Sequence, residues 1–595
     1  MRAVLSVFLL TAVVLAGCAK APAPEPTGSL AELTASSPLS AYLHDLSPLD
    51  PAIKFASAKL EHDRIAASDG VALDTWIAIP PGAGPFPLIL TITPYYSGGA
   101  PASLGRLGDD FLARGYAVGV STVRGTGLSG GCFEQGSVQE GKDNAAVVEA
   151  LAAKPWSNGN VGLIGVSYEG TTPAETWIES PPHLKTIVPI AGITDFYKYN
   201  FVNGVPILIQ GYGFNAYYWA QEDLLWDSNA PGDPQDTGSI LDSITGAPCP
   251  EQASVQQGGA TSSLDGDKNA YWQSRDFVAR LADRVKAGHT PTASVLYVHG
   301  LQDWNVKEHM EEGWLPAIAQ TGVPFKMLFG QWPHAWPDST NPKTLCKVLD
   351  GKGSACRDDW WNGTLVAWFD QFLKGRDTGI LAAPKVQVQD DDGIWRHEAS
   401  FPPTEDTNAT FWLSDGHLGP PGSGSGSFQD AGTSTLVANG APGTVAQHLV
   451  FLSGPLDADL NVAGTPRFVA NVTAQGPRAS LILTLAEVDE NGAFRAVNFA
   501  AQSLNHVRSL EAGEPDVHGK TESVDVRFFL QDDVLHKGHR IALIASTNTE
   551  ADGQPGPSLQ PISAGGPIVI RYAGAKLVLP VDPTVVPESP QPFAT

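Results

Sequence analysis

The chain has 595 residues, a formal net charge of −26 and 42% hydrophobic residues, which is enough apolar material for several cores. Its length is typical of about two to four domains. The acidic balance argues against a nucleic-acid partner, because phosphate binding needs clustered Lys and Arg. It is typical instead of the soluble surface of an exported protein.

The first residues have the pattern of an export signal. Arg2 precedes an apolar stretch at positions 4–14 that is too short to span a bilayer, and small residues then lead to Cys18. This pattern is similar to a bacterial lipoprotein signal, so we expect 1–18 to be a signal with lipid attached to Cys18. An ordinary secretory signal is the alternative. Residues 19–37, rich in Ala and Pro, predict a flexible tether to the periplasmic or extracellular face of the cell envelope.

Four further cysteines follow the signal, at Cys132, Cys249, Cys346 and Cys356. Export permits disulfides, and four cysteines allow three pairings that the sequence does not distinguish. We take Cys346 with Cys356 as the first expectation, because the two flank a short loop. No Cys-x-x-Cys or paired Cys/His spacing occurs, so we expect neither a metal nor another cofactor.

Strand-like and helix-like segments alternate over residues 38–193 and again over 288–399. Apolar runs typical of buried strands include 88–92 and 161–164, and positions 143–153 have helical periodicity. This alternation predicts a parallel sheet with helices on both faces. Between the two parts, residues 194–287 break the alternation, and we expect them to form a helical cap over the active-site end of the sheet.

Ser167 lies where a predicted strand turns into a predicted helix, in the stretch Gly-Val-Ser-Tyr-Glu-Gly that begins at Gly165. Such a turn is typical of a nucleophile elbow, which exposes the serine oxygen above the sheet and needs glycine on either side. Glu169 takes the usual second glycine position, and Gly170 follows one residue later. The elbow geometry makes the backbone N–H of Tyr168 one expected donor to an oxyanion.

A nucleophilic serine needs a base and an orienting acid, which in α/β-hydrolases follow as Asp or Glu and then His, each after a strand. Asp303 follows the apolar run 294–298, and His334 follows 327–329, so both satisfy this order. His299, His309 and Asp338 are the alternatives nearby in the sequence.

A second oxyanion donor is expected from the loop after an early strand, at positions 93–99. This loop lacks the His-Gly-Gly-Gly sequence of lipases, but a hydroxyl of Tyr95 or Tyr96 could donate instead. The alternative is that these tyrosines only pack.

After residue 400 the sequence consists of short strand-like runs separated by Gly, Pro and Asn turns. Examples are 448–452, 480–485 and 540–544. With little helical periodicity, this pattern predicts an all-β sandwich over 400–595.

Together these segments resemble the X-prolyl dipeptidyl-peptidase family of serine hydrolases, which includes cocaine esterase and α-amino-acid ester hydrolases. The resemblance is carried by Thr93-Pro94-Tyr95, the glycine-rich loop from Arg124 to Gly131, Ser167-Tyr168-Glu169-Gly170 as the family's Ser-Tyr-x-Gly, the segment Trp368 to Gly375, and Lys537-Gly538-His539-Arg540. It implies an α/β-hydrolase domain with an inserted helical cap, followed by an all-β jelly-roll domain. It also implies that Ser167 is the nucleophile, Asp303 the acid and His334 the base, with Tyr95 and Tyr168 in the oxyanion hole.

The resemblance implies an acyl-enzyme mechanism, and the segments after Pro182 are more similar to the peptidases that release Xaa-Pro dipeptides than to the esterases. Such a peptidase must recognise a free α-amino group, and cap carboxylates could pair with it. The candidate substrate-contacting residues are Trp219, Glu222, Asp223, Trp304 and Trp332; packing or solvation in the cap is the alternative explanation for the cap residues. An esterase or acylase acting on small or α-amino-acid esters remains an alternative function, as does a non-catalytic binding protein. The oligomeric state, a homo-oligomer included, stays open.

Overall fold

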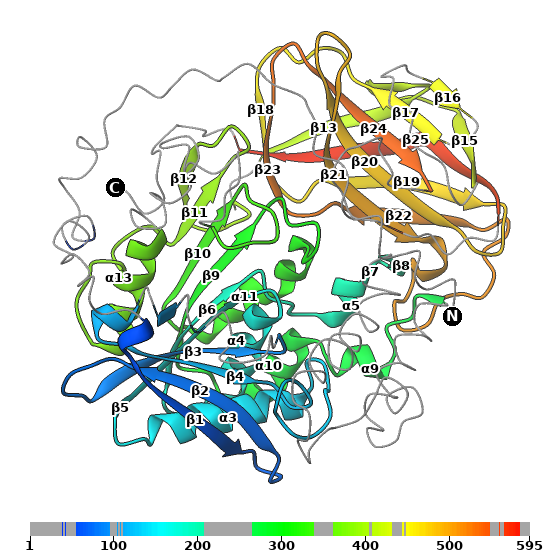
Figure 1. Ribbon diagram of the computed structural model, residues 1–595. Coiled ribbons are helices and arrows are strands. Elements are labelled where there is room, and N and C mark those ends of the chain that lie inside the picture. The colour runs from blue at the N-terminus through cyan, green and yellow to red at the C-terminus, as the bar shows by residue number, and fades with distance from the viewer. Residues whose placement is uncertain are drawn as a thin grey trace, which may run out of the picture.

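The computed structural model describes most of the chain beyond the expected signal and tether. The described residues are 55–95, 111–207, 265–337, 361–403, 407–430, 443–445, 448–547 and 565–582, with Leu39, Tyr42, Leu104, Leu107, Gly108 and Leu559. They form two parts, each built on a large β-sheet (Figure 1). Within these residues, no helix is both long enough and apolar enough to cross a membrane.

The first sheet has ten strands in the order β1-β2-β4-β3-β5-β6-β9-β10-β11-β12. Neighbouring strands are parallel from β4 through β11, whereas β1, β2 and β12 at the edges run antiparallel to their neighbours. The strands are β1 (Lys59–Ala66), β2 (Ala72–Ile79), β3 (Phe86–Thr93), β4 (Ala117–Thr122), β5 (Ser157–Val166), β6 (Leu184–Ile190), β9 (Ser294–Gly300), β10 (Phe325–Gly330), β11 (Val386–Gln389) and β12 (Trp395–Glu398). The parallel centre confirms the predicted α/β sheet.

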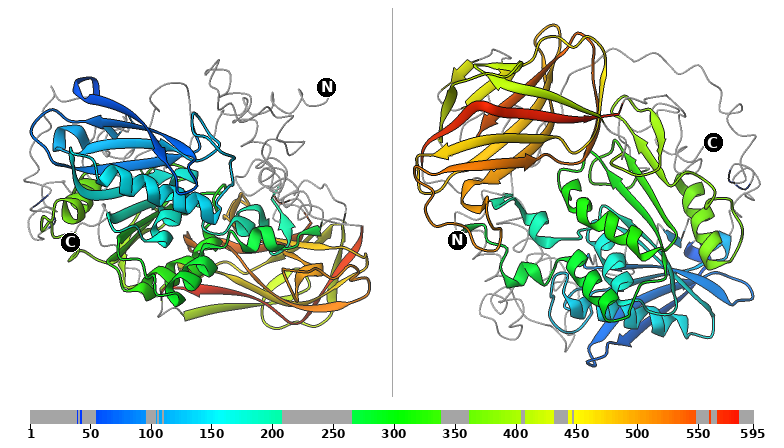
Figure 2. Two further views of the ribbon diagram at one scale, coloured as in Figure 1. Left: turned by 90° about the horizontal axis from the view of Figure 1, so that it is seen from below. Right: turned by 180° about the vertical axis from the view of Figure 1, so that it is seen from behind.

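Side chains of this sheet alternate between its two faces and fill two separate cores. On β3, Leu88 and Leu90 belong to one core and Ile89 to the other, as the two-residue repeat of a strand requires. Helices α3 (Val138–Ala152), α4 (Tyr168–Glu179), α10 (Phe277–Lys286) and α11 (Glu311–Thr321) contribute to the first core, and α13 (Asn362–Leu373) contributes to the second. Helices therefore cover both faces (Figures 1 and 2).

Only the two ends of the expected cap, residues 194–287, are described. Its first end holds α5 (Phe196–Asn200) and the hairpin of β7 (Phe201–Val202) and β8 (Val205–Pro206), and its second end holds α9 (Ala270–Gln273) and α10. Helix α10 packs against α4 and α11. Short 3₁₀ helices complete the described helices: η2 (Phe55–Ser57), η3 (Leu112–Arg114), η6 (Glu308–Met310) and η8 (Leu504–His506).

The described residues from Thr407 onward form a thirteen-stranded sheet around one apolar core, with η8 as their short helical turn. The path runs β21-β20-β24-β17-β14-β13-β25-β18-β23, and β15, β16, β19 and β22 pair beside it. The strands are β13 (Thr407–Ser414), β14 (His417–Gly419), β15 (Ser425–Asp430), β16 (Gly443–Val445), β17 (His448–Leu452), β18 (Leu460–Gly464), β19 (Arg467–Ala474), β20 (Ser480–Val488), β21 (Phe494–Ser503), β22 (Thr521–Arg527), β23 (Gln531–Leu535), β24 (Arg540–Ser546) and β25 (Gly566–Val581). A mostly β C-terminal domain is thus confirmed.

The β-domain docks on the end of the first sheet where β9 and β10 terminate (Figure 1). Apolar side chains of β7 and β8 pack with Phe499 and Phe529 in a small core shared by the two domains. A buried ion pair joins Arg396 of β12 to Asp532 of β23. The amide of Gln331, just after β10, also donates to the carbonyl of Asp532 at 2.9 Å. The β-domain therefore contacts the loops that follow β9 and β10, through the shared core and through Gln331.

Candidate active site

Ser167 stands at the sharp turn between β5 and α4. Its backbone has φ 67° and ψ −128°, a conformation that L side chains rarely adopt. The N–H of Ser167 donates to the carbonyl of Ile190 at 3.0 Å, and the N–H groups of Gly170 and Thr171 return to the carbonyl of Ser167. The surrounding backbone therefore holds the strained serine in place, which is the geometry expected of a nucleophile elbow.

The two glycines of the elbow are required by close backbone contacts. A Cβ atom on Gly165 would lie 2.4 Å from the Cβ of Glu169, and one on Gly170 would lie 2.3 Å from the carbonyl oxygen of Ile190. Both distances are far inside van der Waals contact, so neither position tolerates a side chain. The displaced second glycine thus follows from the approach of α4 to β6 at Gly170, while Glu169 is accommodated at 7% exposure.

Asp303 and His334 meet at the carboxyl end of the same sheet. Asp303 follows β9 and His334 follows β10, so the parallel strands bring both to the edge where β5 ends at Ser167. His334 Nδ1 lies 2.7 Å from Asp303 Oδ2, with the histidine side chain 22% exposed and the aspartate fully buried. The N–H groups of Asn305 and Val306 donate to Asp303 Oδ1 at 2.9 and 2.8 Å.

The charge state of Asp303 is set by these contacts. Burial by itself would raise the pKa of Asp303, but His334, by charge and hydrogen bond, and His299 together with the Val306 N–H hold that pKa below its usual range. An ionised Asp303 fixes the tautomer of His334, which leaves Nε2 as the basic nitrogen.

Tyr95 and Tyr168 flank the serine from two directions. The Tyr95 hydroxyl, after β3, lies 3.3 Å from Ser167 Oγ. The side chain of Tyr168 points away into the core, where it accepts from the Gly136 N–H at 2.7 Å and donates to Glu140 Oε2 at 3.0 Å. Tyr168 can therefore serve an oxyanion only through its backbone, whereas Tyr95 can serve it through its hydroxyl. Tyr96 lies outside the described residues.

The structure contains a buried acidic pair beneath the elbow, which the sequence did not reveal. Glu140 on α3 and Glu175 on α4 are both fully buried. Burial raises the pKa of Glu140 to about 7, and burial together with the charge of Glu140 raises the pKa of Glu175. Arg280 on α10 donates to the Gly136 carbonyl at 3.0 Å. No local pattern signals these residues, because three different helices bring them together.

Only two of the five candidate substrate-contacting residues lie within the described part of the chain. Trp219, Glu222 and Asp223 lie outside the described residues. Trp304, directly after Asp303, packs edge-on against Phe499 of the β-domain, with ring centroids 5.3 Å apart. Trp332 is 1% exposed and its ring fills the space beside Gly300 and Gly330, so packing accounts for its position. Substrate contact by these tryptophans stays a prediction.

Several other candidate residues also lie outside the described part of the chain, whereas some lie inside it. Cys18 and Asp338 lie outside the described residues, as does the expected pair Cys346–Cys356. Cys132 is disulfide-bonded. His309 is half-buried, and desolvation, with the charges of Lys198 and Lys307, places its pKa well below the usual range.

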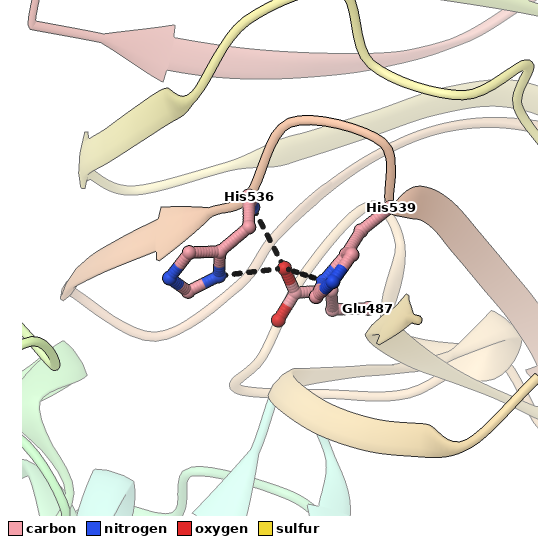
Figure 3. Close-up of side chains that lie close together, drawn as sticks. All are labelled: Glu487, His536 and His539. Carbon is pink, nitrogen blue, oxygen red and sulfur yellow. Dashed lines mark hydrogen bonds and ion pairs between the residues drawn. The ribbon is translucent and has the colours of Figure 1, made fainter. Parts of the chain in front are cut away.

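Glu487, His536 and His539 form the one described group of three side chains with metal-ligand spacing. Figure 3 shows both rings directed at one carboxylate oxygen of Glu487. That oxygen accepts from His536 Nδ1 at 3.0 Å and His539 Nδ1 at 2.8 Å, while Arg495 donates twice to the other oxygen. Because hydrogen bonds already satisfy both oxygens and Arg495 neutralises their charge, we assign these residues to holding the β23–β24 turn.

Two family models match the chain, and together they span more than half of it. The model described as X-Pro dipeptidyl-peptidase (S15 family) matches residues 69–336, and that of the X-Pro dipeptidyl-peptidase C-terminal non-catalytic domain matches 378–565. The second match includes β11 and β12 of the first sheet and most of the β-domain, and it ends just before β25.

Related proteins and solved structures agree with these matches. A candidate Xaa-Pro dipeptidyl-peptidase of Bacillus cereus is 29% identical over 466 residues, covering 74% of this chain and 72% of that protein. One of Bacillus anthracis is 28% identical over 82% of each chain. Two solved structures share the fold: an aminopeptidase from a marine-sediment Thaumarchaeota archaeon and an α-amino acid ester hydrolase. Each has a TM-score of 0.68 and 18% sequence identity, and each match covers 90% of this chain. The matches cover 98% of the aminopeptidase chain and 99% of the ester hydrolase chain. The chain belongs to the X-Pro dipeptidyl-peptidase (S15) family of hydrolases.

Proposed function

We propose that this protein is a serine hydrolase that releases Xaa-Pro dipeptides from the N-termini of peptides. The single observation that carries the proposal is the strained Ser167 at the same sheet edge as the hydrogen-bonded Asp303–His334 pair. The names of the relatives from Bacillus cereus and Bacillus anthracis support the dipeptide product.

In this mechanism Ser167 Oγ attacks the carbonyl carbon of the proline residue, and His334 Nε2 accepts the serine proton. The tetrahedral oxyanion receives hydrogen bonds from the Tyr95 hydroxyl and the Tyr168 N–H. His334 then gives the proton to the departing amine, which leaves an acyl-enzyme ester on Ser167. Water, deprotonated by His334, hydrolyses this ester and releases the dipeptide.

The same proposal includes a jelly-roll β-domain, a helical cap and a lipid anchor. The strand pattern after residue 400 supports a jelly-roll arrangement of the β-domain, and the break in alternation over 194–287 supports a helical cap. The sequence around Cys18 supports lipid attachment, which would hold the enzyme at the periplasmic or extracellular face of the cell envelope.

Mass spectrometry of peptide digests tests the proposal. The substrates are a heptapeptide beginning Ala-Pro, its N-acetylated form, and a matched peptide beginning Ala-Ala. We expect the dipeptide from the first peptide alone, because an Xaa-Pro dipeptidyl-peptidase needs a free amino group and a proline acyl group. Hydrolysis of p-nitrophenyl esters without dipeptide release would assign the esterase alternative. Failure of a fluorophosphonate to label the protein would favour a binding protein.

A further inference from the structure

A second histidine lies directly behind the candidate catalytic acid. His299, near the end of β9, is fully buried. Its Nε2 lies 2.8 Å from the carbonyl oxygen of Val306 and 3.6 Å from Asp303 Oδ2. Its Nδ1 contacts Glu311 Oε1 on α11. The imidazole therefore connects Asp303 to a second buried carboxylate, which the proposed mechanism does not use.

The contacts of His299 determine where its hydrogens lie. A carbonyl oxygen only accepts, so Nε2 must carry a hydrogen to bond Val306. Nδ1 faces a carboxylate oxygen, which also accepts when Glu311 is ionised. The Tyr297 hydroxyl also lies 3.3 Å from Nδ1, but it donates its single hydrogen to Glu311 Oε1. With Glu311 ionised, each ring nitrogen thus faces an acceptor, which is the arrangement that a doubly protonated imidazolium satisfies.

The local charge balance points in the same direction. Asp303 is 0% and Glu311 1% exposed, and two buried carboxylates need a cation between them. Glu311 pairs with His299, and Asp303 pairs with both His299 and His334. Lys307, four residues after Asp303, donates to the carbonyl of Asn305 and lies over the ring of Tyr199.

We propose that His299 is a positioning residue of the hydrolase site, a buried imidazolium that Glu311 keeps protonated and that moderates the charge of Asp303. The proposal rests on the proposed function, since it concerns the acid of the same site. The groups that face the ring are Tyr297 on β9, Glu311 on α11, and Asp303 after β9, with His334 beyond Asp303. Tyr297 donates to the same Glu311 oxygen at 2.9 Å.

The charge on His299 affects the candidate base, His334, through Asp303. A carboxylate beside a histidine stabilises the protonated ring, which cannot accept a proton from serine. The imidazolium on the far side of Asp303 weakens this effect and so favours the neutral ring that accepts the serine proton. Removing the cation without removing Asp303 should therefore move the acidic limb of the rate profile upward.

The first test compares His299→Gln with His309→Gln in the full-length enzyme, using the substrate that the wild type hydrolyses. We expect His299→Gln to move the acidic limb of the kcat/KM profile upward by about one pH unit, from the loss of one nearby charge. On the acidic side of both limbs, we also expect kcat to fall about tenfold with KM changed less than about twofold. His309→Gln, at a histidine that packs against Phe529 of the β-domain, should leave the acidic limb in place. An unshifted limb in folded His299→Gln overturns the proposal.

The second test does not depend on activity or on the folding of His299→Gln. Histidine ring nitrogens are observed by ¹⁵N NMR at pH 8.5 in the wild type, Glu311→Gln and His309→Gln. We expect one histidine with both nitrogens protonated whose resonances move in Glu311→Gln and not in His309→Gln. If the histidine that responds to Glu311→Gln has an unprotonated nitrogen, the proposal is wrong. Failure of dipeptide release by the wild type would instead contradict the proposed function and leave this result standing.

Discussion

Tyr168 donates its hydroxyl to Glu140 Oε2 at 3.0 Å, which ties the residue after Ser167 to helix α3. The N–H of Gly136 donates to both partners, at 2.7 Å to the Tyr168 hydroxyl and 3.2 Å to Glu140. The elbow is therefore anchored from below by a carboxyl group that is fully buried. We therefore expect the ionisation of Glu140 to change the free energy of unfolding.

The stability of the protein should depend on the protonation of Glu140. Burial raises its pKa from 4.5 to about 7, so the folded state holds the proton more tightly than the unfolded chain. This contribution is fully present below about pH 4.5 and is lost as pH rises through about 7. We expect Glu140→Gln to show a smaller loss of unfolding free energy between pH 4.5 and 7 than the wild type, in urea titrations. Glu511→Gln, at an exposed glutamate, should keep the wild-type loss, and an identical loss in Glu140→Gln would contradict the assignment.

Asp303→Asn should separate the charge of the acid from its shape. The amide keeps an oxygen for the N–H groups of Asn305 and Val306 but no longer fixes the tautomer of His334. We expect kcat to fall by about 10⁴-fold, as in other serine hydrolases that lose this carboxylate, with little change in melting temperature. A kcat within about tenfold of the wild type would show that another residue orients the base.

Tyr95→Phe removes a single hydroxyl beside the nucleophile. Because that hydroxyl lies 3.3 Å from Ser167 Oγ, it can donate to the oxyanion that forms when Oγ attacks the carbonyl. Steady-state kinetics should show kcat lowered by about 10²–10³-fold and KM nearly unchanged. A change in KM alone would instead make Tyr95 a substrate-binding residue.

The docking of the β-domain depends on a buried cation. Arg396 is 4% exposed and is paired with Asp532, with Asp390 and Asp582 each 3.8 Å from its guanidinium. Arg396→Met leaves these carboxylates without their shared partner, and we expect a loss of about 3–5 kcal/mol in chemical unfolding.

The matched control for Arg396→Met is Arg467→Met. Arg467 forms an exposed ion pair with Asp525, in which both side chains are close to half exposed, so its loss should cost less than about 1 kcal/mol. Equal losses of unfolding free energy in the two variants would show that the inter-domain ion pair contributes no more to stability than the exposed pair.

Local sequence was sufficient to predict the α/β sheet and the placement of three site residues after strands. Ser167, Asp303 and His334 each follow an apolar run, and parallel strands place such positions at one edge. Their catalytic roles stay predictions until the variants are measured. The position of β4 between β2 and β3 was not predicted, because strand order depends on pairing between distant segments.

Trp332 shows why side-chain surroundings were harder to predict. It stands two residues before His334, which suggested a place near the substrate. In the sheet, however, Gly330 pairs with Gly300, and the two missing side chains leave the space that the Trp332 ring fills. Glu140, Glu175 and His299 depend in the same way on contacts between separate elements, which no local pattern encodes.

In the proposed reaction, Ser167 attacks a prolyl acyl group. The most direct measurement is the rate of p-nitroaniline release from Gly-Pro-p-nitroanilide by the wild type and by Ser167→Ala at equal concentrations. We predict steady release by the wild type and a loss of several orders of magnitude in kcat for the variant. No release by the wild type, or undiminished release by folded Ser167→Ala, would contradict it.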